Sequence, residues 1–194
     1  MEQIVKTLLE SQAVKFSVNE PFVLPNGWNS PIQYNSCKLL ASPTSRLTVV
    51  SKLLSTVYML GKIDAIMGGS KDSLMWSALV ADKLNLPNGY IDTKGVYGYE
   101  DLKGKKIAII EDLADESSIK AVQAARRVGA KVVGMAAIFS YGFPQTVDAY
   151  ILAGVELQTT TSYAALLDGA LSMNLLKSGD LPKLKEWQES PENW

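Results

Sequence analysis

Two adjacent acids, Glu111 and Asp112, follow the apolar run from Ile107 to Ile110. They are the strongest candidates in the sequence for ligand binding or acid–base chemistry. Two neighbouring carboxylates can accept hydrogen bonds from both hydroxyls of a diol. The same pair could instead end a strand and begin a turn. The sequence contains no histidine, which excludes Ser-His-Asp and Cys-His nucleophile systems and histidine metal sites. Acid–base work therefore falls to Asp, Glu, Lys, Tyr or water.

A second polar segment, Ser70-Lys71-Asp72-Ser73, follows the glycine pair Gly68-Gly69. Glycines let backbone approach a phosphate closely, but a glycine pair also occurs in ordinary tight turns. Lys71 could attract an anion, or Asp72 beside it could pair with it. Both interpretations stay open.

Alternating strands and helices must position these residues. Apolar spacing predicts strands near residues 64–67, 89–91, 106–110, 132–139 and 155–160, and helices near 2–14, 44–60, 74–84, 117–128, 163–173 and 181–189. This order indicates an α/β fold with a doubly wound parallel sheet. Ligands of such sheets bind beyond the carboxyl ends of the strands, which selects the segments 68–73, 92–101, 111–118 and 139–146.

Composition limits the partners. The 194 residues suit one domain, and the net charge of -1 gives no electrostatic reason to expect nucleic acid or an anionic membrane. The single cysteine, Cys37, excludes an intramolecular disulfide and fits a reducing compartment. Residues 1–11 do not resemble a signal peptide, and no stretch reaches the roughly 20 apolar residues that span a bilayer. We therefore expect a cytoplasmic protein.

Five stretches in register resemble the orotate phosphoribosyltransferase family over about residues 8–194. They are residues 13–15 with 26–32, residues 78–87, Ile109-Ile110-Glu111-Asp112-Leu113, Tyr141-Gly142-Phe143-Pro144, and Glu186-Trp187-Gln188. One such match would be weak, but five in register are specific. The chain is identified as a divergent member of this family of type I phosphoribosyltransferases.

The resemblance implies a type I phosphoribosyltransferase-like sheet with a small N-terminal hood, in a single domain over residues 1–194. Residues 1–43 would form the N-terminal helix and hood, residues 44–175 the α/β core, and residues 176–194 the C-terminal helix and tail. It also implies transfer of a ribose 5-phosphate group from phosphoribosyl pyrophosphate to orotate, in pyrimidine nucleotide synthesis. Magnesium and a homodimer, in which a loop of one subunit completes the other's site, belong to the same expectation.

Site residues follow from the same resemblance. It places Glu111 and Asp112 over the ribose hydroxyls, Ser117 and Ser118 in the 5′-phosphate loop, and Lys71 in the pyrophosphate loop. Ser30 and Tyr34 fall on the base-binding side. Tyr34 could stack on a ring, or it could belong to the core.

The phosphate loop departs from the family pattern. Leu113-Ala114-Asp115-Glu116 replaces a longer stretch with Thr-Gly-Gly, whose backbone amides close around the phosphate. A carboxylate about 5 Å from a phosphate costs roughly 3 kcal/mol per charge pair at an effective dielectric near 20. We therefore interpret Asp115 and Glu116 as acids that favour the positive end of the following helix.

Other loops depart as well. Asp92 stands where the family has arginine, and residues 93–101 replace a long mobile loop, so we expect a compact hairpin or turn there.

On the base-binding side, Asn29 replaces a lysine, and residues 33–37 replace an aromatic residue followed by Asp-Asn-Arg. These changes remove the pair of cationic side chains that suits an anionic base. Cys37 has no cationic cluster nearby in sequence, so we interpret it as a packed thiol.

These departures favour a family member with degraded or lost transferase activity, which acts as a ligand-binding or regulatory homologue. Its catalytic residues are unassigned, and it would need no metal. The alternative is an active phosphoribosyltransferase with orotate or another base as acceptor, in which Glu111 and Asp112 hold ribose, Lys71 or Lys94 supplies charge, and Mg²⁺ is required. Either way, the expected ligand is a small nucleotide or base.

Overall fold

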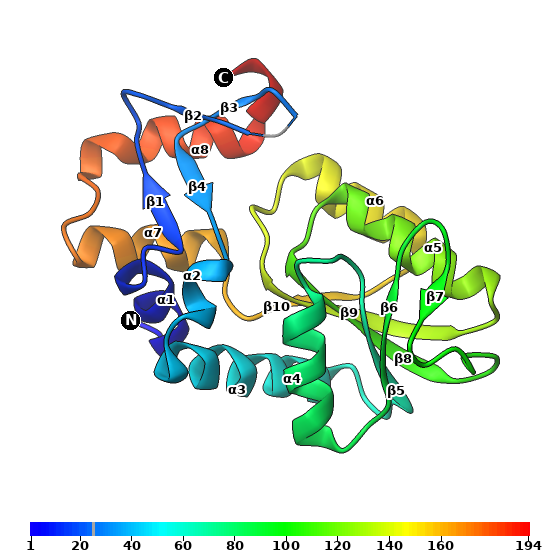
Figure 1. Ribbon diagram of the computed structural model, residues 1–194. Helices are drawn as coiled ribbons and strands as arrows, with labels where there is room; N and C mark the ends of the chain where they lie inside the picture. The colour runs from blue at the N-terminus through cyan, green and yellow to red at the C-terminus, as the bar shows by residue number, and fades with distance from the viewer. Residues whose placement is uncertain (25) are drawn as a thin grey trace. The chain divides into compact units, whose positions relative to one another are not determined.

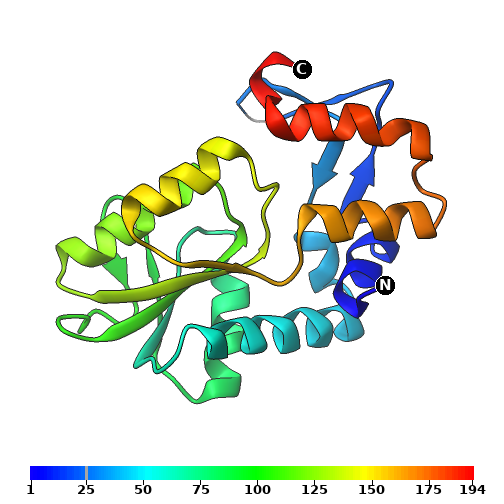
Figure 2. The same ribbon diagram turned by 180° about the vertical axis from the view of Figure 1, so that it is seen from behind.

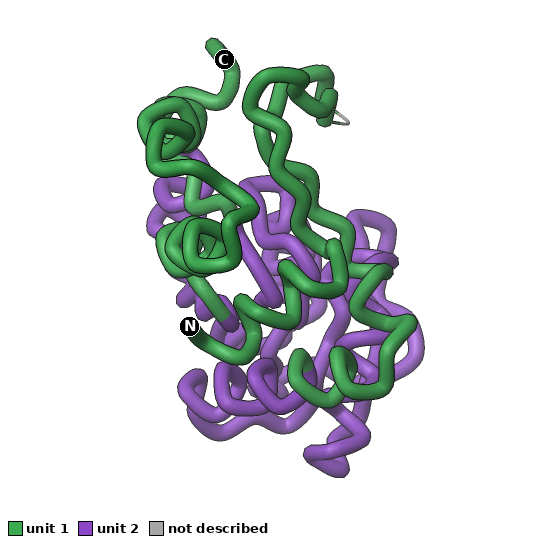
Figure 3. Tube along the Cα trace, turned by 90° about the vertical axis from the view of Figure 1, so that its left-hand side faces the viewer, with its two compact units in different colours: residues 1–49, 141–144, 161–194 green, residues 50–140, 145–160 purple. Residues whose placement is uncertain are grey.

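A computed structural model describes residues 1–24 and 26–194, which form two compact units. Unit 1 comprises Met1–Val49, Tyr141–Pro144 and Thr161–Trp194, and unit 2 comprises Val50–Ser140 and Gln145–Thr160 (Figure 3). Each unit is therefore discontinuous in sequence. The expected division of one domain at residues 43 and 175 stays a prediction.

Unit 2 is built on a six-stranded sheet with the order β10-β9-β8-β5-β6-β7. Its strands are β5 (Ala65–Gly68), β6 (Asn88–Ile91), β7 (Val96–Tyr97), β8 (Lys106–Leu113), β9 (Lys131–Phe139) and β10 (Leu157–Thr159). Neighbouring strands pair in parallel, except that β6 and β7 form an antiparallel hairpin at one edge. The predicted parallel α/β sheet is confirmed, and the antiparallel edge is an addition to it.

Helices cover both faces of this sheet. Helix α4 (Leu74–Leu84) lies on one face, while η1 (Glu116–Ser118), α5 (Ile119–Arg127) and α6 (Pro144–Ala153) lie on the other (Figures 1 and 2). Strand β8 is consequently buried from both sides, and Ile107, Ile109 and Ile110 are each 0% exposed. This double burial explains why its sequence is a continuous apolar run rather than an alternation. Helix α3 (Pro43–Met59) contributes residues to both units.

Unit 1 combines short strand pairs with helices. Its elements are α1 (Gln3–Glu10), β1 (Val14–Phe16), β2 (Phe22–Val23), β3 (Asn29–Ser30), β4 (Ile32–Tyr34), α2 (Cys37–Leu40), α7 (Tyr163–Ser172), η2 (Ser178–Asp180), α8 (Leu181–Glu189) and η3 (Pro191–Asn193). Strand β1 pairs with β4 and β2 with β3, both antiparallel. Helix α1 packs closely on α7 at Gly169, where an added Cβ would lie 2.3 Å from Val5 Cγ1.

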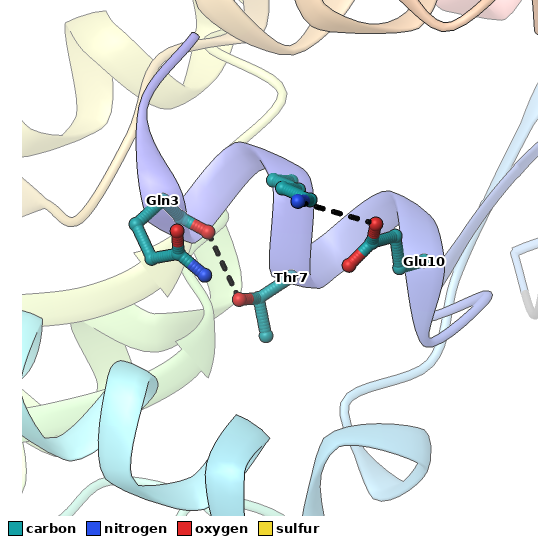
Figure 4. Close-up of polar contacts among 4 residues, drawn as sticks. Gln3, Thr7 and Glu10 are labelled. Carbon is teal, nitrogen blue, oxygen red and sulfur yellow. Dashed lines mark hydrogen bonds and ion pairs between the residues drawn. The ribbon is translucent and has the colours of Figure 1, made fainter.

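Contacts within α1 are local. The Thr7 hydroxyl donates to the Gln3 carbonyl oxygen at 2.9 Å, and Lys6 Nζ lies 3.7 Å from Glu10 Oε1 (Figure 4). The predicted helix over residues 2–14 is too long, because Gln12 has φ 56° and Val14 already pairs with Tyr34.

An aromatic cluster joins two family-like stretches of unit 1. Trp187 is 0% exposed, and its ring meets those of Tyr141 and Phe143 edge-on at centroid distances of 5.0 and 4.9 Å. Trp187 Nε1 donates to the Asn29 carbonyl oxygen at 3.1 Å, and Gln188 Nε2 donates to that of Tyr141 at 2.6 Å. Residues 141–144 and 186–188 thus share one packing site.

Cys37 is exposed, so its interpretation as a packed thiol is wrong: it starts the short helix α2, of which only Leu39 is buried. Among the described residues, no helix has both the length and the apolar character needed to cross a membrane.

Candidate active site

The carboxyl ends of β5 and β8 bring together two of the predicted ligand-binding segments. The strands are parallel neighbours with Gly68 opposite Ile110, and Gly69 N donates to the Ile110 carbonyl oxygen at 3.1 Å. An added Cβ at Gly69 would lie 2.3 Å from Glu111 Oε1. Gly69 therefore lets segment 68–73 pack directly against the acid that ends the apolar run of β8.

Glu111 is only 2% exposed, and its Oε2 accepts a hydrogen bond from the Ser70 hydroxyl at 2.6 Å. Burial raises the pKa of Glu111 to about 8; the hydrogen bond from Ser70 opposes that rise, and the nearby Asp112 and Asp115 add to it. At neutral pH this carboxyl is therefore largely protonated. Asp112, the second acid, is half-buried.

Hydrogen bonds between its own serines stabilise segment 68–73. Ser70 N donates to Ser73 Oγ at 3.0 Å, Ser73 N donates to Ser70 Oγ at 3.2 Å, and Ser73 Oγ donates to the Ser70 carbonyl oxygen at 2.9 Å. Lys71 and Asp72 are exposed and, within the part of the chain that the structure describes, form no ion pair with each other. Lys71 thus remains available to an anion.

Asp115 begins the helix that follows β8. Its Oδ1 accepts from the backbone amides of Ser117 at 2.8 Å and Ser118 at 3.2 Å, and from the Ser117 hydroxyl at 2.6 Å. Ser118 Oγ accepts in return from Asp115 N at 3.3 Å, which completes a capping box. The structure agrees with the interpretation of Asp115 as an acid that stabilises the start of the helix. Its carboxylate already satisfies these two amides.

Segment 92–101 begins as a tight hairpin. Asp92 Oδ1 accepts from the amides of Lys94 at 2.7 Å and Gly95 at 3.0 Å, and the rings of Tyr90 and Tyr97 stack with centroids 5.8 Å apart. The expected compact hairpin is thereby confirmed. Lys94 is exposed at its turn.

The predicted base-side residues belong to unit 1. Ser30 is 0% exposed, its hydroxyl donates to the Ile32 carbonyl oxygen at 2.6 Å, and it accepts from Ile32 N at 3.2 Å. Tyr34 is half-buried at the end of β4. Glu111, Asp112, Ser117, Ser118 and Lys71 all lie in unit 2. The ligand contacts assigned to these seven residues stay predictions.

The sequence prediction for this segment assigns no role to Ser70 or Ser73, although a signal for their hydrogen bonds is present. Serines three residues apart just before a helix often exchange side-chain and backbone hydrogen bonds. That pattern accounts for the bonds between the two serines, but not for the bond from Ser70 to Glu111.

Comparison with known proteins shows which family this chain belongs to. No family model matches the chain. The orotate phosphoribosyltransferase of Phocaeicola vulgatus is 39% identical over 197 residues, which covers 96% of this chain and 93% of that protein. The chain belongs to the orotate phosphoribosyltransferase family.

Solved structures agree on the fold. The orotate phosphoribosyltransferase of Aeropyrum pernix has a TM-score of 0.73 at 25% identity, over 86% of this chain and 98% of that chain. UMP synthase of Leishmania donovani has a TM-score of 0.82 at 22% identity over 96% of this chain, which spans 41% of that longer protein. The predicted type I phosphoribosyltransferase-like fold is confirmed. The names of the relatives give no sign of lost activity and favour the active alternative over the degraded one.

Proposed function

We propose that this chain is a phosphoribosyltransferase of pyrimidine nucleotide synthesis, with phosphoribosyl pyrophosphate as donor and orotate or another base as acceptor. The observation that carries the proposal is the 39% identity to the Phocaeicola vulgatus orotate phosphoribosyltransferase over 96% of the chain. In this proposal Glu111 and Asp112, at the end of β8, accept hydrogen bonds from the ribose hydroxyls. Ser117 and Ser118 follow in the loop that faces the 5′-phosphate.

The reaction breaks the bond between ribose C1 and a pyrophosphate oxygen and forms one between C1 and a ring nitrogen of the base, whose N–H proton is released to the departing pyrophosphate or to water. The leaving pyrophosphate takes the electron pair with it, so its negative charge needs cations nearby. Lys71 and Lys94 are exposed on two of the loops that follow strands of unit 2. We assign that supporting charge to these lysines.

Magnesium enters the proposal only as a companion of the donor substrate. The described residues include no group of three or more His, Cys, Asp or Glu side chains that could hold a metal ion. Mg²⁺ commonly binds through one or two carboxylates together with substrate phosphates, so no residue and no step is assigned to it here.

A homodimer and a cytoplasmic location complete the proposal, and both rest on the family resemblance. Light scattering after size exclusion tests the dimer, for which a mass about twice 21.1 kDa is expected. A mass near 21.1 kDa at micromolar concentration contradicts it.

Transferase activity is tested by incubating the pure protein with orotate, phosphoribosyl pyrophosphate and Mg²⁺. We expect steady formation of orotidine 5′-phosphate that Glu111→Gln and Asp112→Asn each reduce, with circular dichroism as the control for folding. Loss of the signal with EDTA would agree with a magnesium-bound donor. No product with orotate or with other bases, under conditions in which an active relative turns over, overturns this proposal.

Asp115 favours a second candidate function, namely ligand binding without transfer. Its carboxylate accepts from the amides of Ser117 and Ser118, on the loop that replaces the family's phosphate-binding stretch. Repulsion of roughly 3 kcal/mol between this carboxylate and a phosphate about 5 Å away would weaken the binding of phosphorylated ligands. Calorimetry distinguishes the candidates: saturable binding of uridine, but none of phosphoribosyl pyrophosphate, supports the second.

A further inference from the structure

The carboxyl that would receive ribose is covered by the protein itself. Glu111 is 2% exposed, and the backbone of Gly69 lies so close that a single added carbon would lie 2.3 Å from Glu111 Oε1. No ribose hydroxyl can reach a side chain so fully buried unless its cover moves. The cover is the loop Gly69–Ser73, which precedes α4.

Ser70 gives Glu111 the same kind of contact that a ribose would give. Its alcohol hydroxyl donates to Glu111 Oε2 at 2.6 Å, a short hydrogen bond between the hydroxyl and carboxyl oxygens. The reciprocal bonds between Ser70 and Ser73 hold this hydroxyl in place. Because Glu111 belongs to β8, a strand in the middle of the sheet, opening this contact requires the loop rather than the strand to move.

We propose that Ser70 is a gating residue: its hydroxyl competes with the ribose hydroxyls of the ligand for Glu111, and the loop Gly69–Ser73 must move off this carboxyl before a ribose-bearing ligand binds. The inference rests on the proposed function, since phosphoribosyl pyrophosphate supplies the ribose hydroxyls that compete with Ser70. It adds an autoinhibited state to that function. A first ligand contact that opens the loop would release it.

The pKa of Glu111 offers a readout that needs no ligand. The titratable groups that act on this carboxyl are Asp112 and Asp115 on its own segment, Tyr90 on β6 and Tyr150 on α6. Replacing Ser70 has opposite effects in the two states of the loop. With the loop closed, the pKa rises, because a hydrogen bond that lowers it is lost; with the loop open, water reaches the carboxyl and the pKa falls.

The experiment compares wild type with Ser70→Ala, Ser70→Thr and Ser55→Ala. Ser55 is an exposed serine in α3 whose hydroxyl donates to the Ser51 carbonyl oxygen at 3.1 Å, so it is a matched control. Calorimetry with ribose 5-phosphate and with uridine measures affinity, and carbon-13 NMR of the glutamate carboxyls measures the pKa of Glu111. Two probes are used because one carries a phosphate and the other does not.

Removing a competing hydrogen bond should tighten binding of at least one probe about five- to tenfold in Ser70→Ala. Ser70→Thr, which keeps the hydroxyl, and Ser55→Ala should match wild type. The pKa of Glu111 should fall in Ser70→Ala.

Other outcomes separate the two ideas. If wild type binds a probe and Ser70→Ala binds neither probe more tightly, the gate is overturned while ribose binding stands. If no variant binds either probe, the transferase assay alone decides the proposed function, and the loop over Glu111 is judged by the pKa of Glu111 alone. A fall of this pKa in Ser70→Ala then supports a loop that Ser70 holds closed, and a rise or an unchanged pKa overturns it.

Discussion

At the scale of single residues, burial determines the charge state of Glu111. An exposed glutamate ionises near pH 4.5, but burial raises the pKa of Glu111 to about 8. Between these values the folded protein keeps a proton that the unfolded chain has lost. The free energy of unfolding therefore falls as pH rises through this window and levels off above it.

The first prediction follows from that difference. Wild type should lose up to a few kcal/mol of stability between about pH 4.5 and 8, relative to Glu111→Gln. Glutamine keeps an oxygen that can accept from Ser70 but does not titrate. Urea unfolding of both proteins at several pH values measures the difference, and parallel curves across the window would show that Glu111 does not carry this proton.

The second prediction concerns the negative charge of Asp115. Asparagine can still cap the helix with its side-chain oxygen, but it lacks the charge that repels a phosphate. If that charge excludes phosphate, Asp115→Asn should bind ribose 5-phosphate up to about a hundredfold more tightly than wild type. Affinity measured by calorimetry decides it. The exposed Asp148→Asn on α6 is the matched control, and equal gains in both variants would point to net charge rather than to the loop.

At the scale of elements, Arg126 of α5 holds the end of α6. Its guanidinium donates to the carbonyl oxygens of Ala153 at 2.7 Å and Gly154 at 3.1 Å, where a helix leaves carbonyls without partners and favours a positive charge. Arg126→Met should lower the free energy of unfolding by about 1 kcal/mol, since the side chain is exposed and the bonds are screened by water. The adjacent Arg127→Met should change it by less than about 0.5 kcal/mol. Denaturant unfolding tests both, and equal effects would contradict a specific role for Arg126.

Elements whose boundaries depend on local chemistry were predictable. Helix α4 matches the predicted residues 74–84, because Asn85 adopts φ 51° and ends it. Helix α8 matches residues 181–189, with a proline in its first turn. The antiparallel pairing of β7 was not predicted, since a two-residue strand is too short to show a period. The exposure of Cys37 depends on packing that its neighbours in sequence do not reveal.

The site was predictable as a location but not as a set of contacts. Topology alone selected four segments, because the ends of parallel strands meet at one edge of a sheet, and the structure brings the two after β5 and β8 into contact. The bond from Ser70 to Glu111 joins residues 41 positions apart. It depends on the register between β5 and β8, which pattern and composition do not fix.

At the scale of the whole molecule, the chain passes between the two units at four peptide bonds, after residues 49, 140, 144 and 160. Neither unit is a continuous piece of sequence, and the segments of each unit continue into the other. When one unit unfolds, the segment ends of the other unit are therefore no longer held in place. We therefore propose that residues 1–194 unfold as one cooperative domain.

Tryptophans can test this cooperativity, because Trp76 is the one tryptophan of unit 2 and Trp28, Trp187 and Trp194 belong to unit 1. In Trp76→Phe, fluorescence reports on unit 1 alone, while far-ultraviolet circular dichroism reports on the helices of both units. We expect the two urea transitions of this variant to coincide. Val122 is buried in unit 2, and Val122→Ala should cost about 2 kcal/mol of stability. In the double variant Trp76→Phe/Val122→Ala, the fluorescence transition of unit 1 should move as far as the dichroism transition. A fluorescence transition that stays in place while the dichroism curve splits would mean that the units are separate domains.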